Sequence, residues 1–218
     1  MKIGLILSGC GVNDGTEIHE AIITMLCLDM QKVEIKYFAP DIKQTHVINH
    51  ISGEIMPEER NIMIESARIA RGSIEPLETA NLEDLDAIIL PGGSGAMKNL
   101  SNIFIDPKSP EIESSVKKAI TFMHQTKKPI GAICISPVIV ANALSSYSPD
   151  VTIGNDPNIA SMIKLFGGTH INCKVNDIVV DEKNIIVSTP AYMIAKGPAE
   201  VYQGISKLVD KIIELCRK

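Results

Sequence analysis

The hydrophobic pattern of this chain alternates between short aliphatic runs and amphipathic stretches. A continuous apolar run over residues 2–8 predicts a buried strand, and residues 17–31 carry apolar side chains at helical spacing. Thr16 is the expected cap of that helix, and residues 33–39 form the next apolar run, which ends at a proline. A strand, a crossover helix and a second strand in this order predict a parallel sheet.

The rest of the chain continues this alternation. The further helices are expected over residues 111–125, 137–144, 157–166 and 198–215, and the further strands over 86–91, the run before Cys134, and 151–154. Residues 176–181 and 184–188 flank a turn, which predicts a hairpin or a strand pair at a sheet edge. The sequence therefore predicts one α/β domain over residues 1–218, with a doubly wound, mostly parallel sheet and helices on both faces.

Residues 41–85 depart from the regular pattern. Polar groups stand among isolated apolar residues in the first part, and a helix is expected to start at residues 57–60, run through Arg71 and stop at Gly72. We interpret this segment as an insertion on the sheet edge or over its mouth.

Composition and charge narrow the class of protein. The 218 residues are 45% hydrophobic but only 4% aromatic, with no Trp, which predicts an aliphatic core. A net charge of −5 and the lack of any basic run longer than two residues argue against a nucleic-acid partner. No segment approaches the roughly 20 apolar residues of a membrane-spanning helix, so no membrane partner is expected.

The N-terminus contains a deceptive motif. Leu7-Ser8-Gly9-Cys10 spells a bacterial lipoprotein cleavage box. The apolar run before it covers only residues 3–7, which is shorter than the ~7–15 residues of a secretory segment. We interpret the run as a first buried strand and expect a cytoplasmic location.

The cysteines are spread too widely to form a framework. There are five, Cys10, Cys27, Cys134, Cys173 and Cys216. An odd number without a CxxC pair indicates reduced thiols rather than disulfides or a zinc site. Residues 92–96 are rich in glycine but lack the spacing of a phosphate-binding loop. No cofactor and no metal are therefore predicted.

Cys134 stands where a short apolar strand turns into a helix. Ser136 and Pro137 are suited to the cap and the first turn of that helix. The first amides of the helix would then point at the thiol and favour the thiolate, which lowers the pKa of a cysteine. This predicts a nucleophile on a tight strand-to-helix turn. The alternative is a buried, unreactive cysteine.

Two other strand ends carry groups that suit the same site, because functional groups of doubly wound sheets gather at the carboxyl ends of the strands. Gly92 and Gly93 follow one strand, and their amides suit an oxyanion site. Glu17, His19 and Glu20 lie in the helix after the first strand. Cys10 ends that same strand, so a second thiol beside the site is an open alternative.

Taken together, these motifs resemble the PfpI-type branch of the class I glutamine-amidotransferase-like superfamily, which includes the parkinsonism-associated deglycase. The resemblance is greatest to the ElbB type, known as isoprenoid-biosynthesis or glyoxalase-like proteins. It extends over nearly the whole chain and is carried by Ile6-Leu7-Ser8-Gly9-Cys10-Gly11, Glu17-Ile18-His19-Glu20, Val47-Ile48-Asn49-His50, Leu90-Pro91-Gly92-Gly93 and Thr189-Pro190-Ala191-Tyr192-Met193.

The resemblance assigns roles to particular residues. It implies that Cys134 is the nucleophile and that Glu20 hydrogen-bonds its thiol. It also implies that the amides of Gly92 and Gly93, or of Ile135 at the turn, hold an oxyanion. Many relatives have a histidine directly after the cysteine, where this chain has Ile135. His170, in a later loop, is the candidate third catalytic group. No His-x-Glu pair stands near the C-terminus, which argues against a true glutamine amidotransferase.

The resemblance also implies a function. We expect a cysteine-dependent, glutathione-independent glyoxalase-like lyase that converts methylglyoxal or glyoxal to lactate or glycolate with a Cys–Glu dyad. Its partner would be a small aldehyde substrate, and the family implies a homodimer. The alternative is a non-catalytic redox-sensing or partner-binding protein, loosely linked to isoprenoid biosynthesis, in which the cysteine oxidises to a sulfinic acid.

Overall fold

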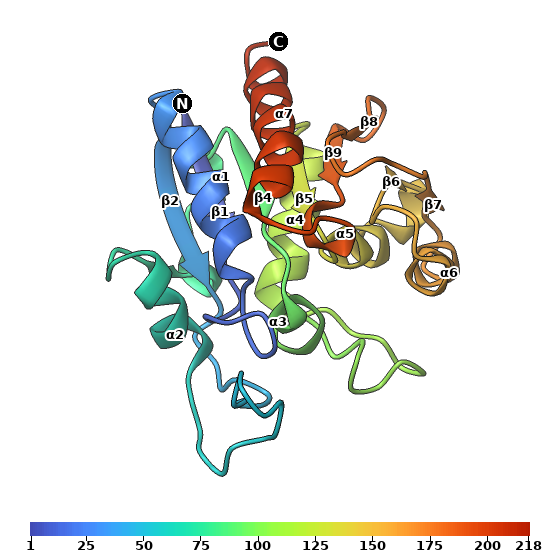
Figure 1. Cartoon of the computed structure of the whole chain (residues 1–218). Coiled ribbons are helices and arrows are strands. Elements are labelled where there is room, and N and C mark those ends of the chain that lie inside the picture. The colour runs from blue at the N-terminus through green and yellow to red at the C-terminus, as the bar shows by residue number, and fades with distance from the viewer.

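Seven strands form one sheet in the order β3-β2-β1-β4-β5-β9-β8 in the computed structural model, which describes all residues from 1 to 218 (Figure 1). The strands are β1 (Lys2–Ile6), β2 (Glu34–Ala39), β3 (Glu75–Pro76), β4 (Ala87–Leu90), β5 (Ile130–Ile133), β8 (Val179–Asp181) and β9 (Ile186–Thr189). Only β8 runs antiparallel to its neighbour, and it forms the first strand of the predicted pair, with β9 as the second. The predicted doubly wound, mostly parallel sheet is confirmed.

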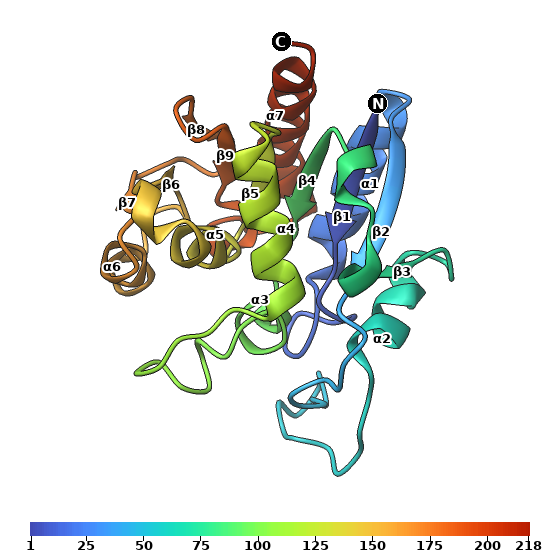
Figure 2. The same cartoon turned by 180° about the vertical axis from the view of Figure 1, so that it is seen from behind.

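Helices cover both faces of this sheet. They are α1 (Ile18–Met30), α2 (Ile62–Ile69), α3 (Ser94–Lys98), α4 (Ser114–Gln125), α5 (Pro137–Ala143), α6 (Pro157–Leu165) and α7 (Pro198–Cys216). Figure 1 shows α1 and α7 side by side on one face, and Figure 2 shows α4 on the other. The loops at the carboxyl ends of the parallel strands all project from the lower end of the molecule in these views.

The core is aliphatic, as the composition predicts. Strands β4 and β5 are completely buried, because helices cover them on both sides. Phe38 and Phe166 are the two aromatic side chains in the cluster of 47 buried residues that fills the interior. A dense core under β4 and β5 fixes the two strand ends that carry Gly92 and Cys134.

The cap of α1 differs from the prediction. Glu17, not Thr16, occupies the cap position, and its carboxylate accepts a hydrogen bond of 2.7 Å from the Glu20 amide. Thr16 is buried, and its hydroxyl accepts a hydrogen bond of 2.7 Å from the Ser8 amide. The Thr16 hydroxyl thus accepts a backbone amide just after β1 instead of capping α1.

Residues 41–85 are only partly an insertion. The loop over residues 43–61 projects at the carboxyl end of the sheet, and α2 starts at Ile62 because the Asn61 side chain caps it, later than predicted. The remainder returns to the sheet as the edge strand β3, followed by the short 3-10 helices Leu77–Thr79 and Leu82–Asp84. The sequence pattern misses β3 because it has only two residues.

A small parallel pair lies apart from the main sheet. β6 (Asp150–Val151) pairs with β7 (Thr169–His170), and α6 connects them. His170, predicted in a loop, therefore lies in a strand. No helix of the protein has the length and apolar character needed to span a bilayer.

Candidate active site

Cys134 lies directly after β5 in a sharp turn. Its backbone is left-handed, with a φ of +61°, which costs a non-glycine residue of order 1–3 kcal/mol and occurs most often at functional sites. The Cys134 amide donates to the Thr189 carbonyl at 2.9 Å, and the Ser136 hydroxyl donates to the Pro91 carbonyl at 2.6 Å. Ser136 holds the cap position of α5 as predicted, but its hydroxyl binds the neighbouring loop rather than the helix. The turn is thus tied to the ends of both adjacent strands.

Glu20 reaches this turn from the first turn of α1. Its side chain is completely buried, and its Oε2 accepts a hydrogen bond of 2.9 Å from the Gly92 amide. Its Oε1 accepts one of 3.2 Å from the Tyr192 amide. The Cys134 sulfur lies on the same side of Gly92 as the Glu20 Oε2, and the two groups shift each other's pKa. The carboxyl group and the thiol that sequence reasoning paired are therefore neighbours.

The two glycines after β4 serve different purposes. A Cβ atom on Gly92 would lie 2.5 Å from the Cys134 Cβ and 2.8 Å from the Glu20 Oε2, so only glycine fits there. Gly93 has a φ of +101° and packs against the backbone of Gly15 and Glu17. Both glycines are required by close approach.

The oxyanion prediction needs a correction at Gly92. The Gly92 amide already donates to Glu20, so it is not available to a substrate oxygen. The amides of Gly93 and Ile135 lie near enough to the Cys134 sulfur to lower the pKa of its thiol, and neither donates to another acceptor in the protein. These two N–H groups form the donor pair that an oxyanion beside the sulfur would meet.

The protonation states differ from the prediction that helix amides favour a thiolate. Burial raises the pKa of the Cys134 thiol well above its usual value, and the Glu20 charge raises it further, against the smaller effect of the Ile135 and Gly93 amides. Burial and the nearby Glu17 charge also raise the pKa of Glu20 to about 8. Glu20 is therefore protonated and uncharged at neutral pH. In that state it no longer raises the pKa of the Cys134 thiol through its charge.

The sulfur lies beside a cavity of about 280 Å³. Its walls are mostly apolar and consist of Val12, Glu17, Gly93, Ser94, Phe104, Cys134, Ile135, Ile159, Tyr192 and Met193. Glu17 is the one carboxylic acid among them, since Glu20 lies behind the wall. The cavity suits a small, weakly polar molecule that approaches the Cys134 sulfur.

Two titratable residues of this wall, Glu17 and Tyr192, were given no role in the site by sequence reasoning. Tyr192 follows β9, the strand beside β5, so its place at a strand end was the available signal. Its hydroxyl lies 2.7 Å from the Nδ1 of His19, and that Nδ1 lies 4.0 Å from the Oε1 of Glu17. The sequence placed Glu17 and His19 in the right helix but gave no reason to prefer Glu17.

The structure does not bring His170 to the thiol. The residue pairs with Val151 in the β6–β7 sheet, and its ring Nε2 is buried without a hydrogen-bond partner. Burial and the positive charge of Lys164 lower the pKa of His170. His170 is not part of the cavity wall at Cys134, so the structure gives no support to its role as third catalytic group.

Cys10 is also separate from this cavity. Burial raises the pKa of its thiol, with Glu65, Arg68 and Asp14 as its charged neighbours. Those neighbours place it toward α2, and the second-thiol alternative finds no support. No group of three or more His, Cys, Asp or Glu side chains is arranged to hold a metal ion.

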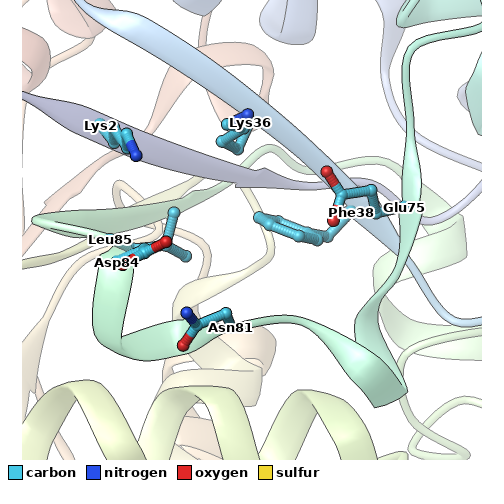
Figure 3. A pocket seen from close by; sticks show the side chains of 7 residues that line it. All are labelled: Lys2, Lys36, Phe38, Glu75, Asn81, Asp84 and Leu85. Carbon is cyan, nitrogen blue, oxygen red and sulfur yellow. The ribbon is translucent and has the colours of Figure 1, made fainter.

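A smaller cavity of about 110 Å³ lies at the β1–β2–β3 side of the sheet (Figure 3). It is lined by Lys2, Lys36, Phe38, Glu75, Asn81, Asp84 and Leu85. Its charges are of both signs, and no cysteine, serine or histidine lines it. The cavity at Cys134 has a thiol in its wall and is the candidate active site.

Known proteins resemble the chain over its full length. It is 40% identical to the human mitochondrial protein called glutamine amidotransferase-like class 1 domain-containing protein 3, covering 100% of this chain and 84% of that protein. The zebrafish mitochondrial ES1 protein is 31% identical, with 100% of this chain and 87% of that protein covered. No family model matches the chain.

Solved structures agree with the fold. An isoprenoid biosynthesis protein with an amidotransferase-like domain from Ehrlichia chaffeensis superimposes with a TM-score of 0.93 at 41% identity, covering 99% of both chains. The Schizosaccharomyces pombe DJ-1 protein has the same fold, with a TM-score of 0.58 at 16% identity. That second likeness concerns the fold alone.

These comparisons correct one prediction and settle another. The human, rat and zebrafish relatives are all named mitochondrial, which overturns the predicted cytoplasmic location. The sequence argument failed because it tested only for a secretory segment. The predicted superfamily is confirmed by the identity and coverage of the same relatives. The chain belongs to the family of glutamine amidotransferase-like class 1 domain-containing proteins, which includes the ES1 proteins.

Proposed function

We propose that this protein is a cysteine-dependent enzyme that converts small reactive aldehydes, such as methylglyoxal or glyoxal, without glutathione. The observation that carries the proposal is the position of the Cys134 sulfur beside a small apolar cavity, with the Gly93 and Ile135 amides near it. The cavity is large enough to admit a compact dicarbonyl substrate. The homodimer implied by the family stays a prediction.

The first step is the addition of the Cys134 thiol to the aldehyde carbonyl. A carbon–sulfur bond forms as the sulfur–hydrogen bond breaks. The ionised fraction of Glu20 takes the thiol proton, and the aldehyde oxygen takes an equivalent proton from water. The amides of Gly93 and Ile135 stabilise the negative charge on that oxygen as it develops. The product is a hemithioacetal with no net change in charge.

The second step moves a proton between neighbouring carbons. Loss of the proton from the former aldehyde carbon gives an enediol, and return of a proton to the next carbon gives a thioester. The first carbon is oxidised and the second reduced, so no external oxidant is needed. Water then cleaves the thioester to lactate or glycolate and restores the thiol. The carbon-bound proton requires a base inside the cavity.

Glutamine hydrolysis is not proposed. The partners of the Cys134 thiol are Glu20 and the Ile135 and Gly93 amides, and no histidine is among them. Tyr192 follows β9 in the run where a true amidotransferase would carry its His-x-Glu pair. The site therefore has a carboxyl group but no imidazole base for amide cleavage.

The test is methylglyoxal consumption by the purified protein in the absence of glutathione. Cys134→Ala is expected to lower kcat by at least ~1,000-fold, because a covalent nucleophile is lost. Cys10→Ala is the matched control, a cysteine at another strand end, and its kcat is expected to stay within about twofold of wild type. Full activity in Cys134→Ala would refute this mechanism. A wild-type protein that converts neither aldehyde would instead favour the non-catalytic role.

A further inference from the structure

We propose that Glu17 is the acid–base residue that contacts the substrate and moves its carbon-bound proton, and that His19 and Tyr192 position it. The inference rests on the proposed function, and it divides the work of the site between two carboxyl groups. Glu20 exchanges the proton of the thiol. Glu17 exchanges the protons of the substrate carbons.

Glu17, unlike Glu20, is accessible from the cavity. Glu20 is completely buried and accepts the amides of Gly92 and Tyr192. It is not part of the cavity wall, so a substrate in the cavity does not reach it. Glu17 is part of the cavity wall, with 11% of its side chain exposed. A general base must come within hydrogen-bond reach of the proton it removes, and Glu17 is the carboxylate that meets this condition.

The Glu17 carboxylate is held in place by two groups. Its Oε2 accepts the Glu20 amide at 2.7 Å as the helix cap, so the carboxylate cannot rotate freely. Its Oε1 lies 4.0 Å from the Nδ1 of His19, whose ring is fixed in turn by the Tyr192 hydroxyl at 2.7 Å. The cap and the ring together orient the carboxylate beside the cavity.

His19 and Tyr192 form a route from the cavity wall to solvent. The His19 side chain is 59% exposed, whereas Tyr192 is part of the cavity wall. His19 and Tyr192 thus connect bulk solvent to the part of the cavity wall that contains Glu17. A proton taken from the substrate can be returned to the next carbon or exchanged with water through His19.

The chemistry of the step follows from these contacts. The Glu17 carboxylate removes the proton from the carbon bonded to sulfur. The electron pair of that carbon–hydrogen bond forms the double bond of the enediol, and the ketone oxygen takes a proton from water. The resulting carboxylic acid then gives its proton to the neighbouring carbon, and the hydroxyl on the first carbon releases its proton to water as the thioester carbonyl forms. Burial raises the pKa of Glu17, which makes the carboxylate a stronger base than an exposed one.

The experiment compares Glu17→Gln with Glu113→Gln in the full-length protein. Glutamine keeps an oxygen that can accept the Glu20 amide, so the cap survives while the acid–base function is lost. Glu113 caps α4 through the Ser115 and Val116 amides and lies outside the cavity wall, which makes it a matched control. We expect kcat for methylglyoxal to fall about 100-fold or more in Glu17→Gln and to change less than twofold in Glu113→Gln.

A second measurement separates this step from the reactivity of the thiol. Iodoacetamide labelling of Cys134, followed by mass spectrometry of its peptide, is expected to stay within about threefold of wild type in Glu17→Gln. A labelling rate that falls as far as kcat would place Glu17 in thiol activation and overturn the division of roles. Unchanged kcat in Glu17→Gln, with Cys134→Ala inactive, would overturn this inference while leaving the proposed function intact. A wild-type protein without aldehyde turnover would overturn both.

The positioning role of Tyr192 is tested by Tyr192→Phe and the pH profile of kcat. The titratable groups that face Glu17 are Glu20 and His19 on α1, Tyr192 after β9 and Cys134 across the cavity. His19 lowers the pKa of Glu17, so a ring released from the Tyr192 hydroxyl lets that pKa rise. We expect the acid limb of the profile to move to higher pH, and an unmoved limb would overturn the positioning role.

Discussion

Cys134 and Cys10 both follow parallel strands of the same sheet, but the chain leaves those strands in different ways. After β5 it turns within three residues into α5, and Cys134 takes a left-handed backbone in that turn. After β1 it passes through a loop of eleven residues, 7–17, before α1 begins. Cys134 is 7% exposed at a cavity, whereas Cys10 is half-buried toward α2. The sharp turn distinguishes the two thiols.

The atoms that reach each thiol also differ. Cys134 meets the Glu20 carboxyl group from one strand end, the Gly93 amide from another and the Ile135 amide from its own turn. Cys10 has charged neighbours but no such converging set. A position at the end of a strand therefore does not by itself make a cysteine reactive. Reactivity requires that groups from several strand ends lie around the same sulfur atom. Variants at Gly92, Glu20 and Ser136 test whether the Cys134 site depends on groups from several strand ends, and the largest effect is expected at Gly92.

Gly92→Ala should disturb the Cys134 site most, because its new Cβ would lie 2.5 Å from the Cys134 Cβ. The free energy of unfolding is expected to fall by about 1–3 kcal/mol or more through overpacking. A displacement of the sulfur by about 1 Å would also lower kcat by about 100-fold. Urea denaturation and turnover of methylglyoxal measure the two effects.

Gly197→Ala is the control for that variant. A Cβ on Gly197 meets nothing within 4 Å, and its φ of −170° suits any residue. Its stability is expected to stay within about 1 kcal/mol of wild type. Equal stability and turnover in the two variants would show that the contact between β4 and the turn is not close enough to matter.

The sequence was sufficient for the general arrangement of the Cys134 site. The aliphatic run before Cys134, followed by Ser136 and Pro137, predicted the strand-to-helix turn, and the resemblance implied that Glu20 would reach the thiol. Both follow from local patterning or from shared motifs. The parallel sheet followed from the regular alternation of apolar runs in the same way.

The details that sequence could not supply depend on which atoms meet. The Gly92 amide was predicted to hold an oxyanion but is bound to Glu20, a contact between residues 72 positions apart. The direction of the Cys134 pKa shift depends on burial, which outweighs the amides that the helix start provides. The sequence did not show that His170 lies in β7, which belongs to the small β6–β7 sheet and not to the main sheet. Local pattern fixes none of these distances.

Glu20 should make the stability of the protein depend on pH. Its pKa is about 8 in the folded state against 4.5 for the free group, so the unfolded chain loses this proton first as the pH rises. The folded state then binds more protons than the unfolded state between these values, and stability falls with rising pH by up to about 1.4 kcal/mol per unit. Chemical denaturation at several pH values measures the slope.

Glu20→Gln should remove that contribution to the slope. A glutamine can accept from only one of the Gly92 and Tyr192 amides, which costs about 1–3 kcal/mol at pH 5. The deficit should shrink and then reverse as the pH rises toward 8, because ionisation of the wild-type carboxyl group costs more than the lost hydrogen bond. The pKa of Glu113 shifts in the opposite direction. Burial alone would raise it, but hydrogen bonds from Ser115 lower it below its usual value. The stability deficit of Glu113→Gln relative to the wild type should therefore shrink as the pH falls. Equal slopes of stability against pH in Glu20→Gln and Glu113→Gln would contradict the assignment of the slope to Glu20.

Ser136→Ala should give the smallest effect and the finest test of convergence. The buried Ser136 hydroxyl donates to the Pro91 carbonyl at 2.6 Å, which ties the cysteine turn to the loop that carries Gly92 and Gly93. Its loss should cost about 1 kcal/mol of stability, because the carbonyl stays buried without a donor. It should also change the rate at which iodoacetamide labels Cys134, since the Gly93 amide is no longer held against the sulfur.

Ser8→Ala is the corresponding change near Cys10. The Ser8 hydroxyl is also buried and lies 3.2 Å from the Thr16 hydroxyl, which keeps its bond from the Ser8 amide when the side chain is removed. We expect a similar or smaller loss of stability, of about 1 kcal/mol or less, and no change in the labelling of Cys134. If both variants changed that labelling equally, the rate would report the general stability of the sheet rather than the tie between β4 and the turn. A change confined to Ser136→Ala would show that one hydroxyl transmits the position of one strand end to the thiol on the next.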